Sequence, residues 1–350
     1  MAVTIHEAKQ MIQSVPRVNL GFFPTPLHKL QKLSEILGVN LYLKRDDLTG
    51  KNQFGGNKTR KLEFLMGKAI QDGCEYVLTY GATQSNHAMQ TTWTALSSGL
   101  KPILYLVAVV EPDENDIKAN MLLDKIYGAE IHIVSMEDNE TFMDAERRSF
   151  LLGEAHVKKL NEQNHKCMEI PLGGASKEGC VAYINGLVEL CEQAEKENIK
   201  FDYLYHATAS GGTMAGLTAG KMLIGSDIEI HSIAALDMGE NYAAHSENLA
   251  NGALEYIGAT ALVKKEDFII DKGFYGEAYE VPTAAGTEAI QFLARNEGLL
   301  VDPVYTGKAF SGLLSDIRTG KIKQGSNVVF LHTGGATGLF AEKEILGRIY

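Results

Sequence analysis

Short apolar runs recur along the chain, and most are followed by a glycine-containing loop and then by a segment in which apolar residues return every three or four positions. Short runs bounded by turns are typical of buried strands, and the longer spacing is typical of amphipathic helices. The runs lie at residues 76–80, 103–110, 130–134, 201–206, 228–234 and 327–331. Strands that alternate with helices in this way predict the α/β fold class, with mostly parallel sheets.

The ends of two predicted helices are marked by residues that favour helix termini. After the first run, Met89, Trp93 and Leu96 have helical spacing, and Ser85 lies where a capping hydroxyl is favoured. A later helix is predicted to end at Gly128, because glycine adopts the conformation that closes a helix.

The charge balance restricts the partners of the protein. The 33 lysines and arginines against 44 aspartates and glutamates leave 33 − 44 = −11, and no run of four cationic residues occurs. Binding to nucleic acid or to an anionic membrane needs a concentrated cationic face, so neither partner is predicted. The most apolar run has eight residues, far short of the ~20 that a membrane span requires. The length of 350 residues predicts two domains.

The cysteines Cys74, Cys167, Cys180 and Cys191 contain no Cys-x-x-Cys pair, and no histidines with zinc-finger spacing accompany them. Reduced thiols and no metal site are therefore predicted. The first residues include Glu7 and lack the apolar core of a signal peptide, which predicts a cytoplasmic protein.

Three turns carry the candidate chemistry, because each lies where a strand gives way to a helix or loop, at the sheet edge that binds ligands in α/β proteins. In the first, Ser210-Gly211-Gly212-Thr213 opens a helix, whose free amides and positive dipole end favour a phosphate. Alternatively, these glycines only permit a sharp turn. The patterns of a P-loop and of the dinucleotide loop Gly-x-Gly-x-x-Gly are absent.

The second turn, at residues 55–63, places Lys58 at the opening of a helix. The positive end of the helix dipole and two further cations, Arg60 and Lys61, disfavour the ammonium form of Lys58. Imine chemistry requires such a free amine. The alternative is a solvated lysine on a basic first turn.

The third turn places Ser85, Asn86 and His87 at a helix start, where hydroxyl, amide and imidazole groups can bind a carboxylate or an aromatic hydroxyl. Alternatively, Ser85 only caps the helix and His87 is partly buried. Tyr279 and Tyr305 are further candidates, since tyrosines near a cofactor can act as acids or stack on rings.

Together these segments resemble the fold-type II pyridoxal-phosphate enzymes, and within them the family of D-cysteine desulfhydrase and 1-aminocyclopropane-1-carboxylate (ACC) deaminase. Each motif alone is weak, but eight occur in the family's order through nearly the whole chain. They are Phe23-Pro24-Thr25-Pro26-Leu27, Leu43-Lys44-Arg45-Asp46-Asp47, Gly55-Gly56-Asn57-Lys58-Thr59-Arg60-Lys61, Gln84-Ser85-Asn86-His87, Pro171-Leu172-Gly173-Gly174, Ser210-Gly211-Gly212-Thr213, Asp302-Pro303-Val304-Tyr305-Thr306-Gly307-Lys308 and His332-Thr333-Gly334-Gly335.

The resemblance implies a tryptophan synthase β-like architecture of two lobes, with open, mostly parallel, twisted sheets that carry helices on both faces and with the cofactor between the lobes. Residues 1–60 and 170–350 are expected to form a large cofactor-binding domain, and residues 61–169 a small domain inserted between them. A homodimer is also implied.

The resemblance also assigns residues to pyridoxal 5'-phosphate. Lys58 matches the lysine that binds the cofactor covalently, and Asn86 matches the residue that hydrogen-bonds the ring hydroxyl. Thr333 matches the hydroxyl residue beside the ring nitrogen. The phosphate loop of the family is matched by Ser210, Gly211, Gly212 and Thr213.

On the substrate side, Ser85, Asn86 and His87 match the loop that receives the substrate carboxylate, and Ser85 or Lys58 is implied as the base at the α-carbon. Tyr279 and Tyr305 match catalytic tyrosines that face the substrate side of the ring. The partner is thus a small amino acid.

The implied reaction is α,β-elimination, with D-cysteine as the first choice of substrate and pyruvate, ammonia and sulfide as products. A neutral Thr333 need not hold the ring nitrogen protonated, which favours expulsion of a β-leaving group over a long-lived carbanion. ACC deaminases have a glutamate after the tyrosine matched by Tyr305, where this chain has Thr306. ACC deaminase, L-cysteate sulfo-lyase and a β-replacement enzyme remain the alternatives.

Two positions depart from the family pattern. Met89 stands where an arginine is usual, and Ala209 where relatives often have a glycine. Outside the family, the alternatives are a nicotinamide dehydrogenase, whose glycine fingerprint is absent, a catalytically idle cofactor carrier and a structural α/β scaffold.

Overall fold

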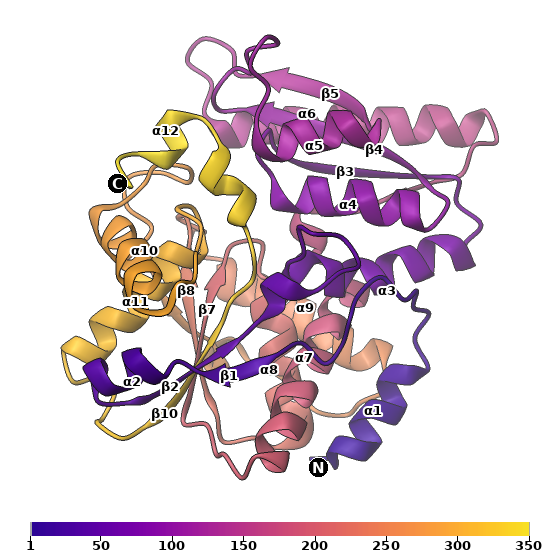
Figure 1. Cartoon of the computed structure of the whole chain (residues 1–350). Helices are drawn as coiled ribbons and strands as arrows, with labels where there is room; N and C mark the ends of the chain where they lie inside the picture. The colour runs from indigo at the N-terminus through magenta and orange to yellow at the C-terminus, as the bar shows by residue number, and fades with distance from the viewer. Residues whose placement is uncertain (1, 350) are drawn as a thin grey trace.

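The computed structural model describes residues 2–349 and contains two β-sheets with helices packed around them (Figure 1). The larger sheet has six strands, and all neighbouring strands are parallel except β1 and β2. In spatial order its strands are β1 (Leu27–Lys29), β2 (Asn40–Lys44), β10 (Asn327–Leu331), β7 (Tyr203–Thr208), β8 (Glu229–Ala234) and β9 (Ile269–Asp271).

The smaller sheet has four strands, and all are parallel. Their order is β5 (Glu130–Ser135), β4 (Lys101–Ala108), β3 (Tyr76–Ala82) and β6 (Cys167–Glu169). The domain boundaries at residues 60/61 and 169/170 stay a prediction.

Twelve α-helices and four short 3-10 helices lie within the described part of the chain. The α-helices are α1 (Ile5–Gln13), α2 (Gln31–Leu37), α3 (Asn57–Gln71), α4 (Asn86–Ser97), α5 (Ala119–Tyr127), α6 (Phe142–Glu162), α7 (Lys177–Lys196), α8 (Gly212–Ile224), α9 (Tyr242–Tyr256), α10 (Ala284–Glu297), α11 (Thr306–Arg318) and α12 (Lys343–Leu346). The 3-10 helices are η1 (Asp46–Leu48), η2 (Leu172–Gly174), η3 (Lys265–Asp267) and η4 (Ala336–Phe340). Over residues 2–349, none of the helices combines the length and apolar character needed to cross a membrane.

Strand β4 shows why a continuous apolar run forms a strand here. Ile103, Tyr105 and Val107 pack in the apolar cluster that includes side chains of α6. Leu104 and Leu106 point to the opposite face and pack with α4. Because successive side chains of a strand alternate between faces, a strand buried on both faces must be apolar at every position.

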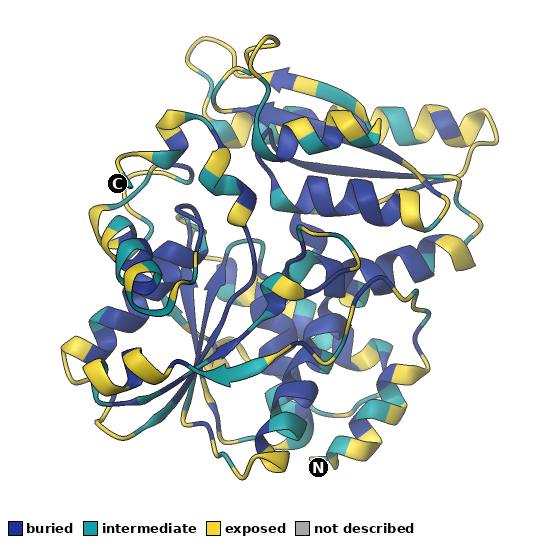
Figure 2. Ribbon diagram, viewed as in Figure 1, coloured by how far each residue is buried: buried dark blue, intermediate teal, exposed yellow. Residues whose placement is uncertain are grey.

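The larger sheet is covered on both faces in the same way. In β10, Val328 and Phe330 pack in the cluster that includes α10 and α11. Val329 and Leu331 pack in the cluster that includes α7 and α8. The central strands β10, β7 and β8 are accordingly buried at every position but the first, while the edge strands β1 and β9 have no buried residue. Exposed residues concentrate on the outer helices and loops (Figure 2). The predicted α/β fold with mostly parallel sheets and helices on both faces is confirmed.

The predicted helix ends agree with the structure at two places. Ser85 is the N-cap of α4, where its Oγ accepts a hydrogen bond from the backbone N–H of Ala88 at 3.2 Å. Gly128 ends α5 with a φ of 76°. Strand β4, however, ends at Ala108 and not at residue 110. The chain bends there, and Val109, which is 41% exposed, begins a loop that carries Glu111, Asp113, Glu114 and Asp116.

Candidate active site

A cavity of about 420 Å³ opens at the carboxyl ends of strands from both sheets. Gly81 and Ala82 end β3, Thr208 ends β7, and Gly334 follows β10. This is the edge at which parallel α/β sheets bind ligands. The predicted site residues that line the cavity are Lys58, Ser85, Asn86, His87, Ser210, Gly211, Thr213, Tyr279, Tyr305 and Thr333. The remaining one, Gly212, is buried at the start of α8.

Lys58 is the second residue of α3 and points to the loop of η2. Its Nζ lies 3.5 Å from the carbonyl oxygen of Gly173. Burial lowers the pKa of the Lys58 amine well below its ordinary value, and the positive charge of Lys61 lowers it further. The shift favours the neutral amine, whose free lone pair makes it a nucleophile and a base.

The direction of this pKa shift agrees with the sequence-based expectation, but its cause differs. Burial is the main cause, and Arg60 is not a free cation beside Lys58. The buried Arg60 guanidinium binds two carboxylates, with its Nε 2.7 Å from Asp46 Oδ2 and its Nη2 2.8 Å from Glu189 Oε1. These carboxylates offset its charge, so Lys61 is the cation that acts on Lys58.

The loop before α8 is suited to an anionic group. Gly211 has a φ of 84°, a left-handed conformation that favours glycine. An ideal Cβ built at Gly212 would lie 2.9 Å from Lys61 Nζ and 3.1 Å from the Cα of Ala175. The first N–H groups of a helix lack partners within the helix, and here a buried lysine lies beside them.

From the sequence, Lys61 is predicted only to act as a charge beside Lys58, with no contact of its own to a ligand. Its Nζ donates a hydrogen bond to the carbonyl oxygen of Gly173 at 3.0 Å, and burial lowers its pKa to about 8. It follows Lys58 by three positions, so both side chains lie on one face of α3. This spacing is the feature of the sequence from which a role for Lys61 could be predicted, because it directs both lysines to the same edge of the cavity.

Asn86 is held in a defined orientation at the start of α4. Its Oδ1 accepts hydrogen bonds from Asn120 Nδ2 at 2.8 Å and from Thr337 Oγ1 at 3.2 Å. These two donors occupy the amide oxygen, so Asn86 offers its Nδ2 donor to a ligand. Thr333 also lines the cavity, and its backbone carbonyl accepts a hydrogen bond from Asn57 N–H at 3.0 Å.

His87 offers a neutral ring. Burial lowers the pKa of His87 well below its ordinary value, and the charges of Lys58 and Lys61 lower it further. Thr79 Oγ1 donates to the carbonyl of Ile170 and lies 2.9 Å from His87 Nε2, so Nε2–H donates to Thr79. His87 Nδ1 is then a lone-pair acceptor. What His87 can offer an incoming carboxylate is its backbone N–H at the helix start.

Tyr279 and Tyr305 meet through their hydroxyl groups at the cavity wall. Their ring centroids are 5.7 Å apart, with the planes at 71°. Burial raises the pKa of both hydroxyls, so both stay protonated at neutral pH. Because one hydroxyl donates to the other, the pair keeps one O–H that can be donated to a ligand.

Thr306 begins α11 and is fully buried beside Asp302. Its Oγ1 and backbone N–H both donate to Asp302 Oδ1, at 2.6 and 2.8 Å. The threonine side chain is thus hydrogen-bonded to Asp302 and does not line the cavity. A glutamate at this position would bring a second carboxylate next to Asp302, which like-charge repulsion disfavours.

Lys308 holds the loop that carries Tyr279. It is buried, and its Nζ donates to the carbonyl oxygens of Tyr275 at 2.8 Å, Ala278 at 3.2 Å and Tyr279 at 3.0 Å. The residues from 272 to 283 form no helix or strand. One ammonium group therefore fixes three carbonyls of an otherwise irregular loop, which makes Lys308 a positioning residue for Tyr279.

Replacing Lys308 with methionine is expected to lower kcat by roughly 10- to 100-fold, because the carbonyls lose their donor and Tyr279 shifts in the cavity. Burial lowers the pKa of Lys308 to about 8, although Asp302 and Glu280 oppose this shift. The wild type should therefore lose kcat as the pH rises through about 8. A pH profile of kcat checks this: the decline should be smaller in the K308M variant, in which Lys61, with a pKa also lowered to about 8, still titrates in that range. An unchanged kcat at pH 7 would contradict the positioning role.

The first two turns of α6 supply cavity residues for which the sequence makes no prediction. Phe142, Met143 and Glu146 line the cavity, and burial raises the pKa of Glu146. No local motif marks them, because the fold alone brings this helix to the cavity. Met89, the departure from the family pattern, lies instead in an apolar cluster that includes Leu62.

The residues present fit pyridoxal phosphate. The helix start at residues 210–213, with Lys61 beside it, suits the phosphate. The neutral amine of Lys58 suits covalent attachment of an aldehyde. The Nδ2 donor of Asn86 and the hydroxyl of Thr333 are the groups that would meet the ring.

Comparisons with known proteins agree with this fit. Residues 18–334 match the model of the family "Pyridoxal-phosphate dependent enzyme". A "Putative 1-aminocyclopropane-1-carboxylate deaminase" of Pyrococcus horikoshii is 37% identical over 330 residues, which cover 94% of this chain and 95% of the relative. A "D-cysteine desulfhydrase" of Serratia proteamaculans is 32% identical over 339 residues, which cover 95% and 98%.

Solved structures of similar fold also support membership of this family. The one described as "Crystal Structure Analysis of the ACC deaminase homologue" has a TM-score of 0.87 and 34% identity, with 100% of both chains covered. Threonine deaminase isoform 2 from Solanum lycopersicum has a TM-score of 0.64 at 14% identity and covers 95% of this chain and 84% of its own, which shows a shared fold. The chain therefore belongs to the fold-type II pyridoxal-phosphate-dependent enzymes, in the family of ACC deaminases and D-cysteine desulfhydrases.

Proposed function

We propose that the protein catalyses α,β-elimination on D-cysteine: D-cysteine and water give pyruvate, ammonia and sulfide. The observation that carries this choice is the environment of Thr306. Thr306 stands where the resemblance places the glutamate of ACC deaminases, and its hydroxyl donates a hydrogen bond to Asp302 Oδ1 at 2.6 Å. Relatives named D-cysteine desulfhydrase, which are 32–34% identical to this chain, support the same substrate.

The substrate carboxylate would bind at the start of α4. The backbone N–H groups there and the hydroxyl of Ser85 are donors, and the positive end of the helix dipole favours an anion. Ser85 Oγ already accepts from Ala88 N–H at 3.2 Å, so its own hydrogen is the part free to donate. Ser85 would therefore orient the substrate more readily than it would remove a proton.

Lys58 is then the base at the α-carbon. Bound pyridoxal phosphate supplies an electron-withdrawing ring that makes the α-proton acidic. Burial lowers the pKa of the Lys58 amine and so favours its neutral form, which can accept that proton. The Tyr279 and Tyr305 pair keeps one O–H, which would be donated to the departing sulfur atom.

ACC deaminase is the second candidate, because relatives that are 35–38% identical to this chain are named putative ACC deaminases. The two activities use the same cofactor and differ in product. Ring opening of ACC gives oxobutyrate and ammonia, whereas D-cysteine gives pyruvate and sulfide.

A substrate panel tests the choice. The purified holoenzyme is incubated separately with D-cysteine, L-cysteine, β-chloroalanine, L-cysteate and ACC, and pyruvate, oxobutyrate and sulfide are measured. We expect pyruvate and sulfide from D-cysteine with the highest kcat/KM of the panel. Oxobutyrate from ACC at a higher kcat/KM would show that Thr306 does not exclude ring opening and would favour the second candidate.

A further inference from the structure

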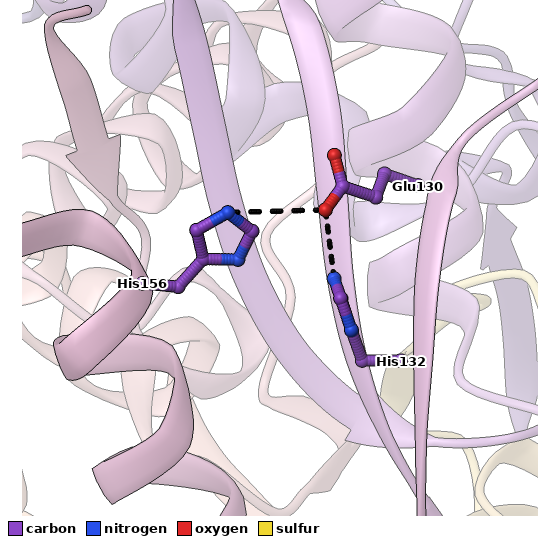
Figure 3. Close-up of side chains that lie close together, drawn as sticks. All are labelled: Glu130, His132 and His156. Carbon is purple, nitrogen blue, oxygen red and sulfur yellow. Dashed lines mark hydrogen bonds and ion pairs between the residues drawn. The ribbon is translucent and has the colours of Figure 1, made fainter. Parts of the chain in front are cut away.

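Two histidines and a glutamate converge between β5 of the smaller sheet and the helix α6 (Figure 3). Glu130 and His132 are alternate residues of β5, so both side chains leave the same face of the strand. His156 reaches them from the facing helix α6. Among the described residues that line the cofactor cavity, none belongs to this cluster.

The three groups are spaced as the ligands of one metal ion. Glu130 Oε1 lies 2.8 Å from His132 Nε2 and 3.8 Å from His156 Nε2, and all three atoms lie within 4.8 Å of one another. A tetrahedral zinc ion with ligands at about 2.0–2.1 Å places neighbouring ligand atoms about 3.3 Å apart. The two glutamate–histidine separations lie on either side of that value, and each differs from it by about half an ångström.

Hydrogen bonding alone does not account for the arrangement. Both rings direct Nε2 at the same carboxylate oxygen, and the 3.8 Å separation from His156 is too long for a hydrogen bond. A cation between the three atoms would interact with all of them at once. Two imidazoles and a carboxylate are also a ligand set that zinc prefers.

A neighbouring side chain orients both rings. The His132 ring stacks on Tyr105, with centroids 4.5 Å apart and planes at 11°. The Tyr105 hydroxyl lies 3.2 Å from His156 Nδ1. When Nδ1–H donates to this hydroxyl, His156 Nε2 carries the lone pair that a metal needs. Metal-binding histidines usually have such an outer partner.

We propose that Glu130, His132 and His156 bind a zinc ion, with water from the solvent completing the coordination. The side chains are 50%, 39% and 18% exposed, so an ion can enter from solvent. The sequence predicts no metal site because only the fold brings β5 and α6 together. Since β5 is an edge strand with one neighbour, β4, the ion would tie it to α6 and stabilise the folded chain.

Calorimetric titration of the chelator-treated holoenzyme with zinc chloride tests the proposal. We expect one zinc ion to bind per chain of the wild type. His132→Gln and His156→Gln should each weaken binding by at least about tenfold, since loss of an outer partner alone costs about 10- to 100-fold. Tyr105→Phe should weaken binding less than either of them. The cofactor absorption band shows that each variant is folded.

His165→Gln is the matched control. His165 also forms an exposed pair with a glutamate, in which Nδ1 lies 3.2 Å from Glu75 Oε2. This variant should bind zinc as the wild type does, and zinc should raise the Tm of both but not that of His156→Gln. Absence of zinc binding in the wild type, or equal loss of affinity in His165→Gln and His156→Gln, would overturn the proposal.

Discussion

Replacing Lys58 with alanine should lower kcat for pyruvate formation by at least about a thousandfold. Two functions are lost together. The variant lacks the amine that attaches the cofactor, and it lacks the base beside the α-carbon. Both depend on burial, which lowers the pKa of the Lys58 amine well below its ordinary value and favours its neutral form. Turnover of saturating substrate by protein reconstituted with pyridoxal phosphate is the measurement.

Lys68→Ala is the matched control for this variant. Lys68 lies on the same helix, α3, but pairs with Asp72 at the protein surface. Its removal should leave kcat within about twofold of the wild type, because surface pairs contribute little. If Lys58→Ala retained a tenth or more of the wild-type kcat, another residue would have to perform the chemistry.

The second large effect is on stability. Replacing Arg60 with methionine should lower the free energy of unfolding by about 3–5 kcal/mol, because Asp46 is left as a buried carboxylate without an ion-pair partner and Glu189 keeps only Lys44. Arg60 is 2% exposed, and its bonds to these two groups are 2.7 and 2.8 Å long. Urea denaturation of the two proteins measures the difference.

An exposed arginine provides the comparison. Arg148 binds Glu140 with an Nη2 to Oε2 distance of 2.6 Å, but its side chain is 32% exposed. Arg148→Met should therefore cost far less stability than Arg60→Met, because solvent screens an exposed pair. Equal losses in Arg60→Met and Arg148→Met would show that burial of the Arg60 network does not matter for stability.

The same network predicts a pH dependence. Burial alone would raise the pKa of Glu189, but Arg60 and Lys44 outweigh it and lower the pKa to about 2. The pKa of a glutamate in an unfolded chain is about 4.3, so the ionised Glu189 stabilises the folded protein above that pH. The stabilisation from Glu189 should be lost as the pH falls from about 4.3 towards 2. The difference in the free energy of unfolding between the wild type and Arg60→Met should therefore become smaller over that range.

The sequence predicts those features of the fold that depend on local patterns. The strand β4 is predicted from its continuous apolar run, because it is buried on both faces. The helix ends at Ser85 and Gly128 are predicted because a serine hydroxyl caps a helix start and glycine adopts the conformation that ends a helix. The end of β4 was misplaced by two residues because apolar character continues into Val109 after the chain leaves the sheet.

Side chains whose roles depend on distant partners could not be assigned in this way. From the sequence, Arg60 is interpreted as a free cation near Lys58, because only the fold brings Glu189 into contact with it. Lys308 belongs to a recognised motif, but its contacts with the loop before Tyr279 require the tertiary structure. Phe142 likewise reaches the cavity only through the packing of α6.

Reduction of the holoenzyme with borohydride, followed by peptide mapping, tests the central claim most directly. The treatment fixes the cofactor on the amine that holds it, and tandem mass spectrometry separates Lys58 from Lys61 within one peptide. We predict that the pyridoxyl label lies on Lys58. A label on Lys61 or on any other lysine, or no label at all, would contradict the account.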